Sequence, residues 1–288
     1  MQEQQTAGEL TASISEAAPS PKRLGPFLKW AGGKRWLCQR YPHLFPTSYS
    51  DYVEPFLGSG AVFFHLSPVR SRLNDSNSVL IDTYRSIRDS WPTVYRKLSQ
   101  HSAGHGEDYY YTQRSKIHTS RNDRAAQFLY LNRSCWNGLY RVNRQGIFNV
   151  PKGTKDKIIL PDDNFELTSA RLKSSRLYNS DFANVLSTAK FNDFAFIDPP
   201  YTVAHNVNGF IKYNENIFTW PDQIRLRDEI KRAVERGAKI LLTNADHQSI
   251  RDLYDGIGKH FVLKRPTVIS GSASGRRMTT ELAIVIGY

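Results

Sequence analysis

The stretch Phe194-Ala195-Phe196-Ile197-Asp198-Pro199-Pro200-Tyr201 joins a short apolar run to a rigid polar loop. Similar apolar runs that end in Gly, Asp, Asn or Pro turns occur on both sides of it, at 50–60, 71–77, 175–182, 238–247 and 281–288. Strands this apolar are typical of a sheet buried on both faces, whose functional loops lie at the carboxyl ends of the strands. Helices are predicted between them at 77–98 and 220–236, the second with Pro221 in its first turn and Gly237 after its end. The pattern predicts an α/β fold.

The composition is that of an ordinary globular protein. The 288 residues are 40% hydrophobic and 23% charged, enough for one or two domains with a core. No apolar run approaches the roughly 20 residues that cross a bilayer, and the spacing of Cys38 and Cys135 matches no zinc or redox motif. Residues 1–23 are polar and lack the features of a secretory signal, so we expect a disordered leader there. These features predict a soluble, cytoplasmic protein without a metal site.

Positive charge is concentrated in one part of the chain. The net charge is +12, and within 110–160 ten Lys and Arg residues stand against two acids, a local excess of +8. Aromatic residues are interleaved with this charge, and the surrounding segment lacks strongly apolar strands. Basic and aromatic side chains together indicate a polyanionic partner, because cations attract phosphates and aromatic faces stack on bases. We predict a nucleic-acid-binding insert at 82–164 within an α/β domain made of 24–81 and 165–288.

A glycine-rich loop, Glu54-Pro55-Phe56-Leu57-Gly58-Ser59-Gly60, directly follows one predicted strand and precedes a helix-like segment. Glycines there allow the backbone to approach a ligand, and the following helix start offers free N–H groups. The loop matches neither the dinucleotide fingerprint nor the phosphate loop, so a nucleotide-like cofactor site and a simple strand-to-helix turn both remain open. Asp75, after the next strand, could accept hydrogen bonds from a ribose diol or merely cap a helix.

The loop from Asp198 to Tyr201 carries the sharpest chemical pattern. Its two prolines fix φ and lack N–H groups, which makes the loop rigid. Asp198 and the Pro199 carbonyl each offer a hydrogen-bond acceptor, and Tyr201 offers a flat face. This combination suits an exocyclic amine on an aromatic base, with both N–H groups accepted and the ring stacked. We interpret it as a catalytic loop.

Four blocks of the chain occur in a fixed order: FLKWAGGK at 27–34, PFLGSG at 55–60, LNRSCWNGLYRVN with GIFNVP at 131–151, and DPPY at 198–201. Together they resemble the Dam-type DNA adenine-N6 methyltransferases. They are similar, in turn, to that family's amino-terminal cofactor motif, glycine loop, DNA-recognition hairpin and catalytic loop. The resemblance runs from about residue 26 to residue 288 and leaves the leader and 101–108 unexplained.

The resemblance implies a Rossmann-like sheet that binds S-adenosylmethionine, with an inserted, mainly helical DNA-recognition domain carrying a β-hairpin. Asp198, Pro199 and Tyr201 would then hold the target adenine. Within the cofactor site, Asp75 would hold the ribose, and Lys34 would lie near the methionine carboxylate or the catalytic loop. The residues implied in cofactor binding are Trp30, Lys34, Phe56, Gly58, Gly60, Asp75, Asp181, Phe182 and Asp198, with Asp181 and Phe182 at the adenine.

The resemblance also assigns residues to DNA binding. Trp136 would occupy the aromatic position that wedges into the duplex, and Arg141 would read bases. Arg141 makes independent physical sense, because arginine is the best bidentate partner for guanine O6 and N7. The implied DNA-binding residues are Lys29, Arg133, Trp136, Asn137, Leu139, Arg141, Asn143 and Pro151.

The implied activity is methyl transfer from S-adenosylmethionine to N6 of adenine in double-stranded DNA, within GATC, by base flipping and direct in-line transfer. Two alternatives remain open: an RNA adenine or protein-glutamine methyltransferase with the same catalytic logic, and a DNA-binding protein that has lost catalysis. The related RNA and protein enzymes usually carry Asn where this chain has Asp198. We expect no obligate protein partner and no membrane association, and a monomer can act on one strand of a palindrome.

Overall fold

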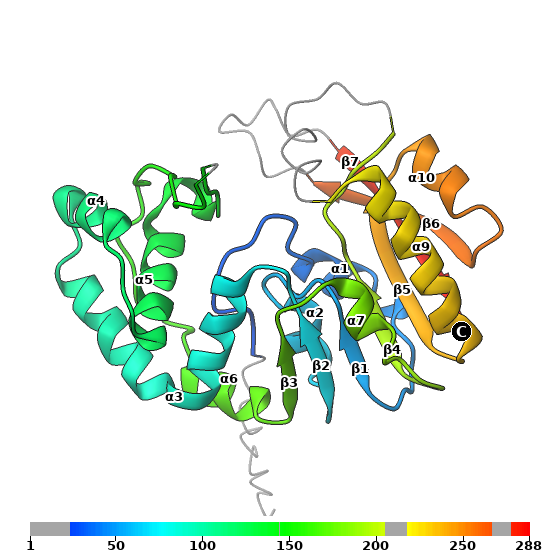
Figure 1. Ribbon diagram of the computed structural model, residues 1–288, viewed down its shortest axis with the longest axis horizontal. Helices are drawn as coiled ribbons and strands as arrows, with labels where there is room; N and C mark the ends of the chain where they lie inside the picture. Colours follow the sequence, from blue (N-terminus) through cyan, green and yellow to red (C-terminus); the bar gives the residue numbers. More distant parts are fainter. Residues whose placement is uncertain (1–23, 144, 205–217, 267–277) are drawn as a thin grey trace, which may run out of the picture.

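The computed structural model describes residues 24–143, 145–204, 218–266 and 278–288, so the expected leader at 1–23 lies outside the described residues. A seven-stranded sheet in the order β3-β2-β1-β4-β5-β7-β6 forms its centre (Figure 1). Strands β3 to β5 in this order are parallel, whereas β7 is antiparallel to both β5 and β6. The strands are β1 (Tyr52–Glu54), β2 (Ser71–Asn74), β3 (Ser175–Tyr178), β4 (Phe194–Ile197), β5 (Lys239–Ala245), β6 (Lys259–Pro266) and β7 (Met278–Ile286). The predicted α/β fold with a Rossmann-like sheet is confirmed.

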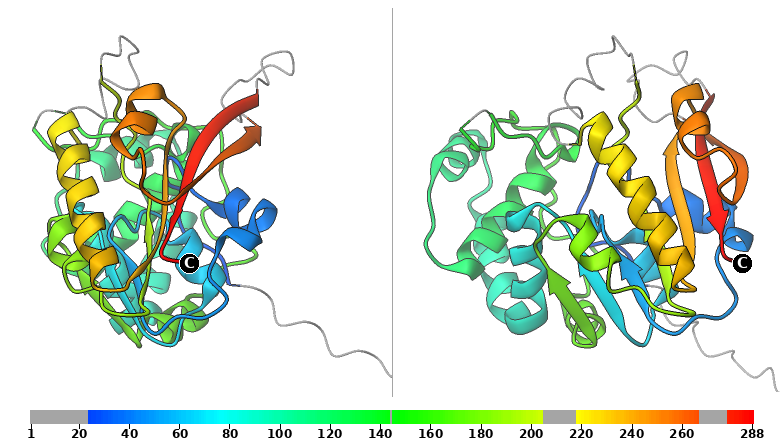
Figure 2. Two further views of the ribbon diagram at one scale, coloured as in Figure 1. Left: turned by 90° about the vertical axis from the view of Figure 1, so that its right-hand side faces the viewer. Right: turned by 45° about the vertical axis from the view of Figure 1, so that its right-hand side comes forward.

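Helices cover both faces of the sheet, because successive side chains of a strand point to opposite sides. In β4, Phe194 and Phe196 belong to the core under α1 and α2, whereas Ala195 and Ile197 belong to the core under α7 and α9. Figure 2 shows the two sets of helices on opposite sides of the strands. One face carries α1 (Arg35–Arg40), the short 3-10 helix η1 (Pro42–Leu44) and α2 (Ala61–Leu66); the other carries α7 (Phe182–Leu186), α9 (Trp220–Glu235) and α10 (Gln248–Leu253).

Helix α9 follows from local rules that the sequence displays. The Thr219 hydroxyl accepts a hydrogen bond from the Asp222 backbone N–H, and the Asp222 carboxylate accepts one from the Thr219 N–H, which together form a capping box. Gly237 adopts a φ of 84° just past the end of the helix. The predicted start at Trp220 is confirmed, and the observed end lies one residue before the predicted one.

The strand order places two functional loops side by side. β1 lies between β2 and β4, with Tyr52 opposite Phe194, so the order reverses its direction at this point. Loops at such a reversal leave neighbouring strands and open a crevice at the carboxyl edge of the sheet. The glycine loop after β1 and the loop after β4 are therefore adjacent, although they are more than a hundred residues apart in sequence.

The segment between β2 and β3 is mainly helical and lies beside the β3 edge of the sheet (Figure 1). Helix α3 bends at Ser90, whose φ and ψ are −151° and 37°, two residues before Pro92. The expected hairpin is reduced, in the part of 135–152 that the structure describes, to isolated antiparallel bridges between Cys135 and Lys152 and between Val142 and Phe148. The helices are α3 (Ser78–Ala103), α4 (Glu107–Ser115), α5 (Arg121–Ser134), the 3-10 helix η2 (Trp136–Gly138) and α6 (Phe165–Leu172).

This helical segment shares one hydrophobic core with the sheet. Tyr84 of α3 packs edge-on against Phe27, with 4.9 Å between ring centroids, and Phe27 also contacts Phe165 of α6. Helix α3 begins at Ser78, so its first turn precedes the expected border at residue 82. The division into 24–81, 82–164 and 165–288 as functional domains stays a prediction.

Arg133 ties the helical segment to the rest of the molecule. Its guanidinium is 2% exposed and forms a bidentate pair with Asp163, with both N···O distances 2.6 Å. It also donates to the carbonyl of Ile158 at 2.7 Å and to that of Phe27 at 2.7 Å. A guanidinium buried and paired in this way is not available to a duplex. This placement argues against the expectation that Arg133 contacts DNA, and we assign it a structural role instead.

The described segments contain no helix that is both long and apolar enough to span a membrane. Cys38 and Cys135 are buried and not joined to each other. Burial raises the pKa of the Cys38 thiol to about 12 and that of Cys135 to about 11, so both thiols stay protonated near neutral pH. Neither is a candidate nucleophile.

Replacing Asp163 by Ala should lower the free energy of unfolding by about 3–5 kcal/mol, because it leaves the Arg133 charge buried without its partner. Asp82→Ala is a matched control, since its partners Arg85 and Arg124 are 31% and 40% exposed and such pairs contribute below about 1 kcal/mol. Urea unfolding followed by circular dichroism measures both. Equal, small losses in the two variants would contradict the structural role of Arg133.

Candidate active site

A buried lysine connects the amino-terminal segment to the sheet. Lys34, at the start of α1, is 3% exposed. Its ammonium lies 2.9 Å from the carboxylate of Asp198 and 3.5 Å from that of Glu281, and it donates to the Gly32 carbonyl at 2.8 Å. A buried ammonium requires such partners, because loss of hydration costs several kcal/mol per ion. The sequence-predicted residues Lys34 and Asp198 therefore meet in one site.

Asp198 directly follows β4, and both oxygens of its carboxylate have partners, Oδ2 in Lys34 and Oδ1 in Thr243. Its Oδ1 accepts a hydrogen bond from the Thr243 hydroxyl of β5 at 2.7 Å and lies 3.2 Å from the Tyr201 hydroxyl, whose single proton it shares with the nearer Glu281. Burial raises the pKa of Asp198, while the neighbouring Lys34 ammonium lowers it and Glu281 raises it. The side chain is 18% exposed. Asp198 is therefore a positioned acceptor at the edge of the protein interior.

Tyr201 is held at both its ring and its hydroxyl. The Lys34 ammonium lies 5.0 Å from the ring centroid, and the hydroxyl donates to Glu281 at 2.8 Å. Burial raises the pKa of Tyr201 well above its usual range, so the phenol stays a hydrogen-bond donor. Arg265 of β6 pairs with the other oxygen of Glu281 at 2.5 Å. The rigid loop after β4 therefore presents Asp198 and Tyr201 together, as the sequence pattern predicts.

Glu281 was not predicted from the sequence. It lies near the start of the apolar stretch ELAIVIGY, where an acidic side chain among residues destined for the core is the only local sign of a special role. Glu54, at the end of β1 and the start of the glycine-rich loop, is a second buried carboxyl group near Asp198, and its sequence context predicts no role for it. It accepts a hydrogen bond from the Tyr52 hydroxyl at 2.9 Å, and burial raises its pKa well above its usual range.

The glycine loop after β1 is held open by backbone conformation and by Asp75. Gly58 has a φ of 48°, and a Cβ atom there would lie 2.7 Å from Cδ1 of Trp30. The Gly58 N–H donates to Asp75 Oδ2 at 3.0 Å, and the Asn77 N–H donates to Asp75 Oδ1 at 2.9 Å. The Gly58 carbonyl accepts from the buried Tyr84 hydroxyl at 3.1 Å. Asp75 thus shapes the loop itself, and its role toward a ribose stays a prediction.

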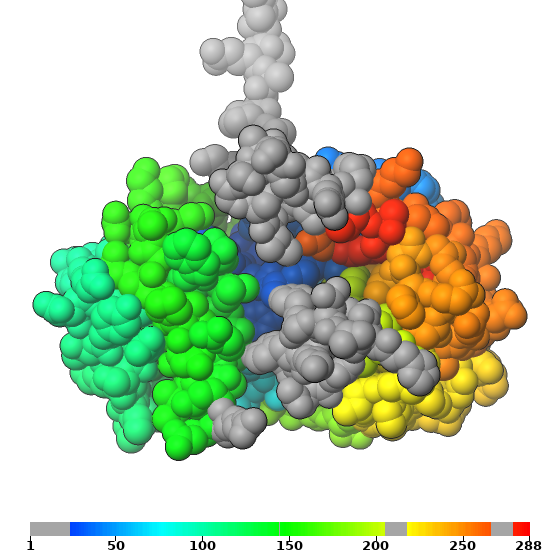
Figure 3. Space-filling view, turned by 90° about the horizontal axis from the view of Figure 1, so that it is seen from above, coloured from blue at the N-terminus to red at the C-terminus, as the bar shows by residue number. Residues whose placement is uncertain are grey.

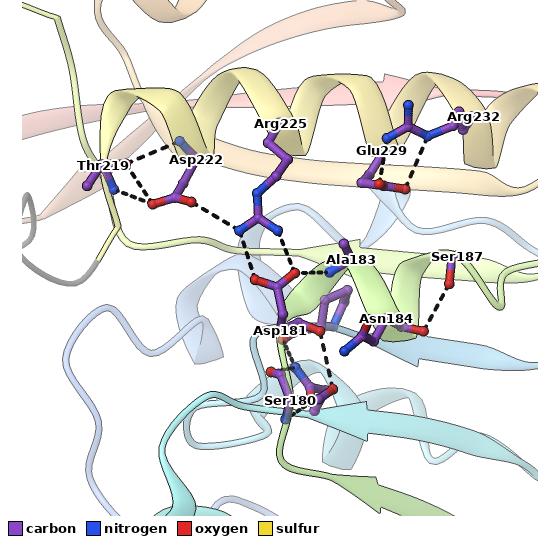
Figure 4. Close-up of polar contacts among 12 residues, drawn as sticks. Ser180, Asp181, Ala183, Asn184, Ser187, Thr219, Asp222, Arg225, Glu229 and Arg232 are labelled. Atoms are coloured by element: carbon purple, nitrogen blue, oxygen red, sulfur yellow. Dashed lines mark hydrogen bonds and ion pairs between the residues drawn. The ribbon is translucent and has the colours of Figure 1, made fainter.

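Phe56 and Phe182 form an aromatic pair beside this loop. Their rings stack with 5.4 Å between centroids. Phe218 contacts both rings, Phe56 edge-on and Phe182 at a tilt. Asp181 accepts two hydrogen bonds from Arg225 at 2.7 and 2.8 Å and caps α7 through the Ala183 N–H, and its expected contact with the cofactor's adenine stays a prediction. Figure 4 shows Arg225 reaching from α9 to Asp181 while also bonding Asp222.

Most of the residues predicted to bind DNA lie on the surface of the hairpin segment, residues 131–152. Trp136 is 52% exposed and Leu139 is 38% exposed. Asn137 adopts a left-handed φ of 54°, and the Arg141 guanidinium bonds the side chain of Asn149 at 2.8 Å. The further exposed members are Asn143 and Pro151. The exposed side chains are thus available to a ligand, unlike Arg133.

This segment is docked on the amino-terminal motif. The Asn132 side chain accepts a hydrogen bond from the Lys29 N–H at 2.9 Å and donates one to the Lys29 carbonyl at 2.8 Å. The ring of Trp30 stacks on Tyr140 with 5.5 Å between centroids. Seen from the carboxyl edge of the sheet, a hollow separates the helical segment in green from the red and orange end of the sheet, with blue amino-terminal residues visible in it (Figure 3). The two groups of predicted site residues therefore share one face.

The model of the D12 class N6 adenine-specific DNA methyltransferase family matches residues 30–268. The chain belongs to this family. It is similar to the Type II methyltransferase M1.LlaDCHI of Lactococcus lactis subsp. cremoris, with 34% identity over 92% of this chain and 96% of the relative. It is also similar to the Type II methyltransferase M.MjaIII of Methanocaldococcus jannaschii, with 33% identity over 83% and 91% of the two chains. The DNA adenine methylase of Escherichia coli K12 is 32% identical over 90% and 94%.

Membership of the D12 class confirms the resemblance and the enzyme class, an adenine-specific DNA methyltransferase. Methyltransferases of this kind generally use S-adenosylmethionine, and the residues present fit such a ligand. The Phe56 and Phe182 rings offer an aromatic environment, and each Asp75 oxygen can accept further hydrogen bonds. The role of each residue stays a prediction.

Replacing Lys34 by Met in this D12 methyltransferase should shift the acid limb of the pH profile of kcat toward higher pH. The ammonium lowers the pKa of Asp198, so its removal raises that pKa, and the ionised carboxylate needed as an acceptor is lost at a higher pH. The rate of tritium transfer to DNA, measured from about pH 5 to 9, gives the apparent pKa of this acid limb. Arg35→Met, an exposed neighbour on α1, is the control, and an unchanged limb in Lys34→Met would refute this account.

Proposed function

We propose that this protein transfers the methyl group of S-adenosylmethionine to N6 of adenine in double-stranded DNA, within GATC, by base flipping and direct in-line transfer. The observation that carries the proposal is the contact of Lys34, Asp198 and Tyr201 at the carboxyl edge of the sheet, beside the glycine loop. The family membership limits the chemistry to adenine N6 in DNA.

The catalytic loop acts by orientation. The Asp198 carboxylate accepts one N–H of the target amine, the Pro199 carbonyl accepts the other, and Tyr201 stacks on the base. The two prolines keep these groups in place, and correct orientation of reactants is among the largest contributions that a site can make to rate. The amine becomes cationic on methylation and loses its proton readily, so Asp198 serves as a positioning acceptor and not as a strong base.

The cofactor site is proposed at the glycine loop, where S-adenosylmethionine supplies the methyl group. Asp75 would accept from its ribose hydroxyls, while Phe182 and Asp181 would contact its adenine. Trp30, Phe56, Gly58 and Gly60 would line the site, with Lys34 between it and Asp198. The Arg225 guanidinium lies 4.3 Å from the Phe182 ring centroid and also bonds both oxygens of Asp181. A carboxylate has about four lone-pair sites, so Asp181 can still accept a hydrogen bond from the adenine.

DNA binding is proposed for the face around the hairpin segment. The target amine lies inside the duplex, so the base must be flipped out, at a cost of a few kcal/mol that protein contacts and stacking offset. Exposed Trp136 supports a role as a wedge, and exposed Arg141 supports one in reading guanine. Asn137, Leu139, Asn143 and Pro151 would complete the base-reading surface, and Lys29 would face the DNA. The local excess of positive charge supports phosphate binding and predicts steep weakening by salt.

The alternatives are less well supported. An RNA or protein methyltransferase would fit the sheet equally well, but Asp198 and the basic segment favour DNA. A catalytically inactive DNA-binding protein would have no need for the buried Lys34 and Asp198 pair, which is costly to maintain. GATC is supported by the resemblance of 131–151 to the recognition hairpin of the GATC branch. A monomer remains our expectation.

Asp198→Ala should reduce methylation more than about 100-fold, because the amine loses its acceptor and its orientation. Cofactor affinity should fall much less, since the glycine loop is untouched. Tritium transfer from labelled S-adenosylmethionine to DNA measures the first effect, and isothermal titration calorimetry the second. Asp255→Ala, at an exposed position after α10, is the control. Full activity of Asp198→Ala would exclude the assigned role.

DNA from cells that express the protein should resist restriction enzymes blocked by GATC methylation and stay sensitive to enzymes that ignore it.

Arg141→Ala should relax discrimination at one guanine position, since a bidentate contact is worth about 1–3 kcal/mol. Comparing methylation rates of a GATC duplex and of duplexes with one changed pair measures this loss.

Lys157→Ala is the matched control for Arg141, because Lys157 is an exposed cation in the same basic stretch, and any contact that it made to phosphate would affect all sequences alike. It should weaken binding to every duplex to the same extent. Protection at a different sequence would refute the GATC assignment, and unchanged discrimination in Arg141→Ala would refute the assigned role of this arginine.

A further inference from the structure

Glu281 of β7 is a buried carboxylate whose partners come from three separate parts of the chain. Its side chain is 6% exposed. It accepts a hydrogen bond from Tyr201 of the catalytic loop at 2.8 Å, pairs with Arg265 of β6 at 2.5 Å, and lies 3.5 Å from the Lys34 ammonium. An unneeded charge at such a position would be costly, because a buried carboxylate must be fully paired to be tolerated.

The register of the sheet explains how Glu281 reaches the site. In β7, Ala283 and Val285 belong to the core under α1. Every second side chain of a strand points to the same face, so Glu281 points to the face of Ala283 and Val285. Glu281 lies opposite Ala245 of β5 and Leu263 of β6, at the carboxyl end of β5. An apolar residue at this position would extend the core. The Glu281 carboxylate instead contacts Tyr201 and Lys34 at the edge where the loop after β4 leaves the sheet.

The contacts of the Tyr201 hydroxyl show what Glu281 does for Asp198. The hydroxyl lies 2.8 Å from Glu281 Oε2 and 3.2 Å from Asp198 Oδ1, so Glu281 is the nearer of these two acceptors. If Glu281 were absent, the hydroxyl would donate its proton to Asp198 Oδ1, which already accepts from Thr243, and would take up a further lone pair that a target amine needs. Lys34, which now lies between both carboxylates, would also be drawn to Asp198.

We propose that Glu281 is a positioning residue that holds the Tyr201 hydroxyl and the Lys34 ammonium, and thereby keeps the Asp198 carboxylate open to the target amine. This inference rests on the proposed roles of Asp198 and Tyr201. The local charges support it, because Lys34 and Arg265 balance Asp198 and Glu281. Loss of one negative charge leaves both cations acting on Asp198 alone.

The electrostatic consequence has a definite sign. The groups that face Asp198 are Lys34 from the amino-terminal segment, Glu281 from β7, Thr243 from β5, Tyr201 from its own loop and Glu54 from β1. Glu281 raises the pKa of Asp198, so removing its charge lowers that pKa. The acid limb of the activity profile should then move to lower pH, opposite to the shift expected for Lys34→Met.

The test compares Glu281→Gln with the wild-type protein. Gln keeps an acceptor for the Tyr201 hydroxyl but cannot balance the cations, so kcat should fall about tenfold, the usual effect of losing a charged hydrogen-bond partner. KM for DNA should change little, and the acid limb should move to lower pH. Fluorescence of a duplex with 2-aminopurine at the target adenine reports whether the flipped base is still held against Tyr201, and should change in Glu281→Gln.

Glu229→Gln is the matched control, because Glu229 pairs with Arg232 of the same helix, α9, at the same distance of 2.5 Å (Figure 4). Within the described residues, the Glu229 carboxylate bonds Arg232 and none of Lys34, Asp198 and Tyr201. Tyr201→Phe removes the hydroxyl and keeps the ring, which gives a second test of the contact between Tyr201 and Glu281. Glu281→Gln should lower kcat less in the Tyr201→Phe background than in the wild type, because the two changes act through one contact.

The outcomes separate the two proposals. A wild-type protein that fails to transfer methyl groups to duplex DNA would refute the proposed function itself. An active wild type with Glu281→Gln indistinguishable from Glu229→Gln in kcat, acid limb and 2-aminopurine signal would overturn the role of Glu281. An equal fall in kcat on Glu281→Gln in the wild-type and Tyr201→Phe backgrounds, together with an unmoved acid limb, would also overturn it.

Discussion

The contact between the Lys34 ammonium and the Asp198 carboxylate is the interaction on which the site depends. Both groups lie largely out of water, where an unpaired charge costs several kcal/mol. Their pairing therefore holds the segment before α1 against the carboxyl end of β4. Glu281, from the opposite end of the chain, joins the same cluster. The site can form only when the amino-terminal segment, the loop after β4 and the last strand are all in place.

The strand order explains why this cluster lies beside the glycine loop. β1 and β4 are neighbours at the point where the order reverses, so their following loops open into one crevice. Asp75 at the end of β2 bonds the Gly58 N–H, which links the glycine loop to the next strand. A methyl donor bound at this loop and a base held by Asp198 would be adjacent without any long-range motion of the sheet.

The positive charge of the chain serves two different purposes. The Arg133 guanidinium makes internal contacts, which join α5 to Asp163 and to the backbone of Phe27. Arg141 lies on the surface of the hairpin segment and stays available to a ligand. Composition counts both alike in the local excess of +8. Only the exposed part of this charge can act on a polyanion, so the effective DNA-binding surface is smaller than the count suggests.

The sequence by itself determined the features that depend on near neighbours. The apolar strands, the start of α9 at its Thr219 cap and the rigid loop from Asp198 to Tyr201 all follow from patterns a few residues long. The tertiary structure alone decided which charges are paired. Arg133 is fixed by Asp163, Asp181 by Arg225 and Tyr201 by Glu281, across 30, 44 and 80 residues. Such pairings depend on how the sheet closes and which faces become buried, and no local pattern in a single sequence carries that information.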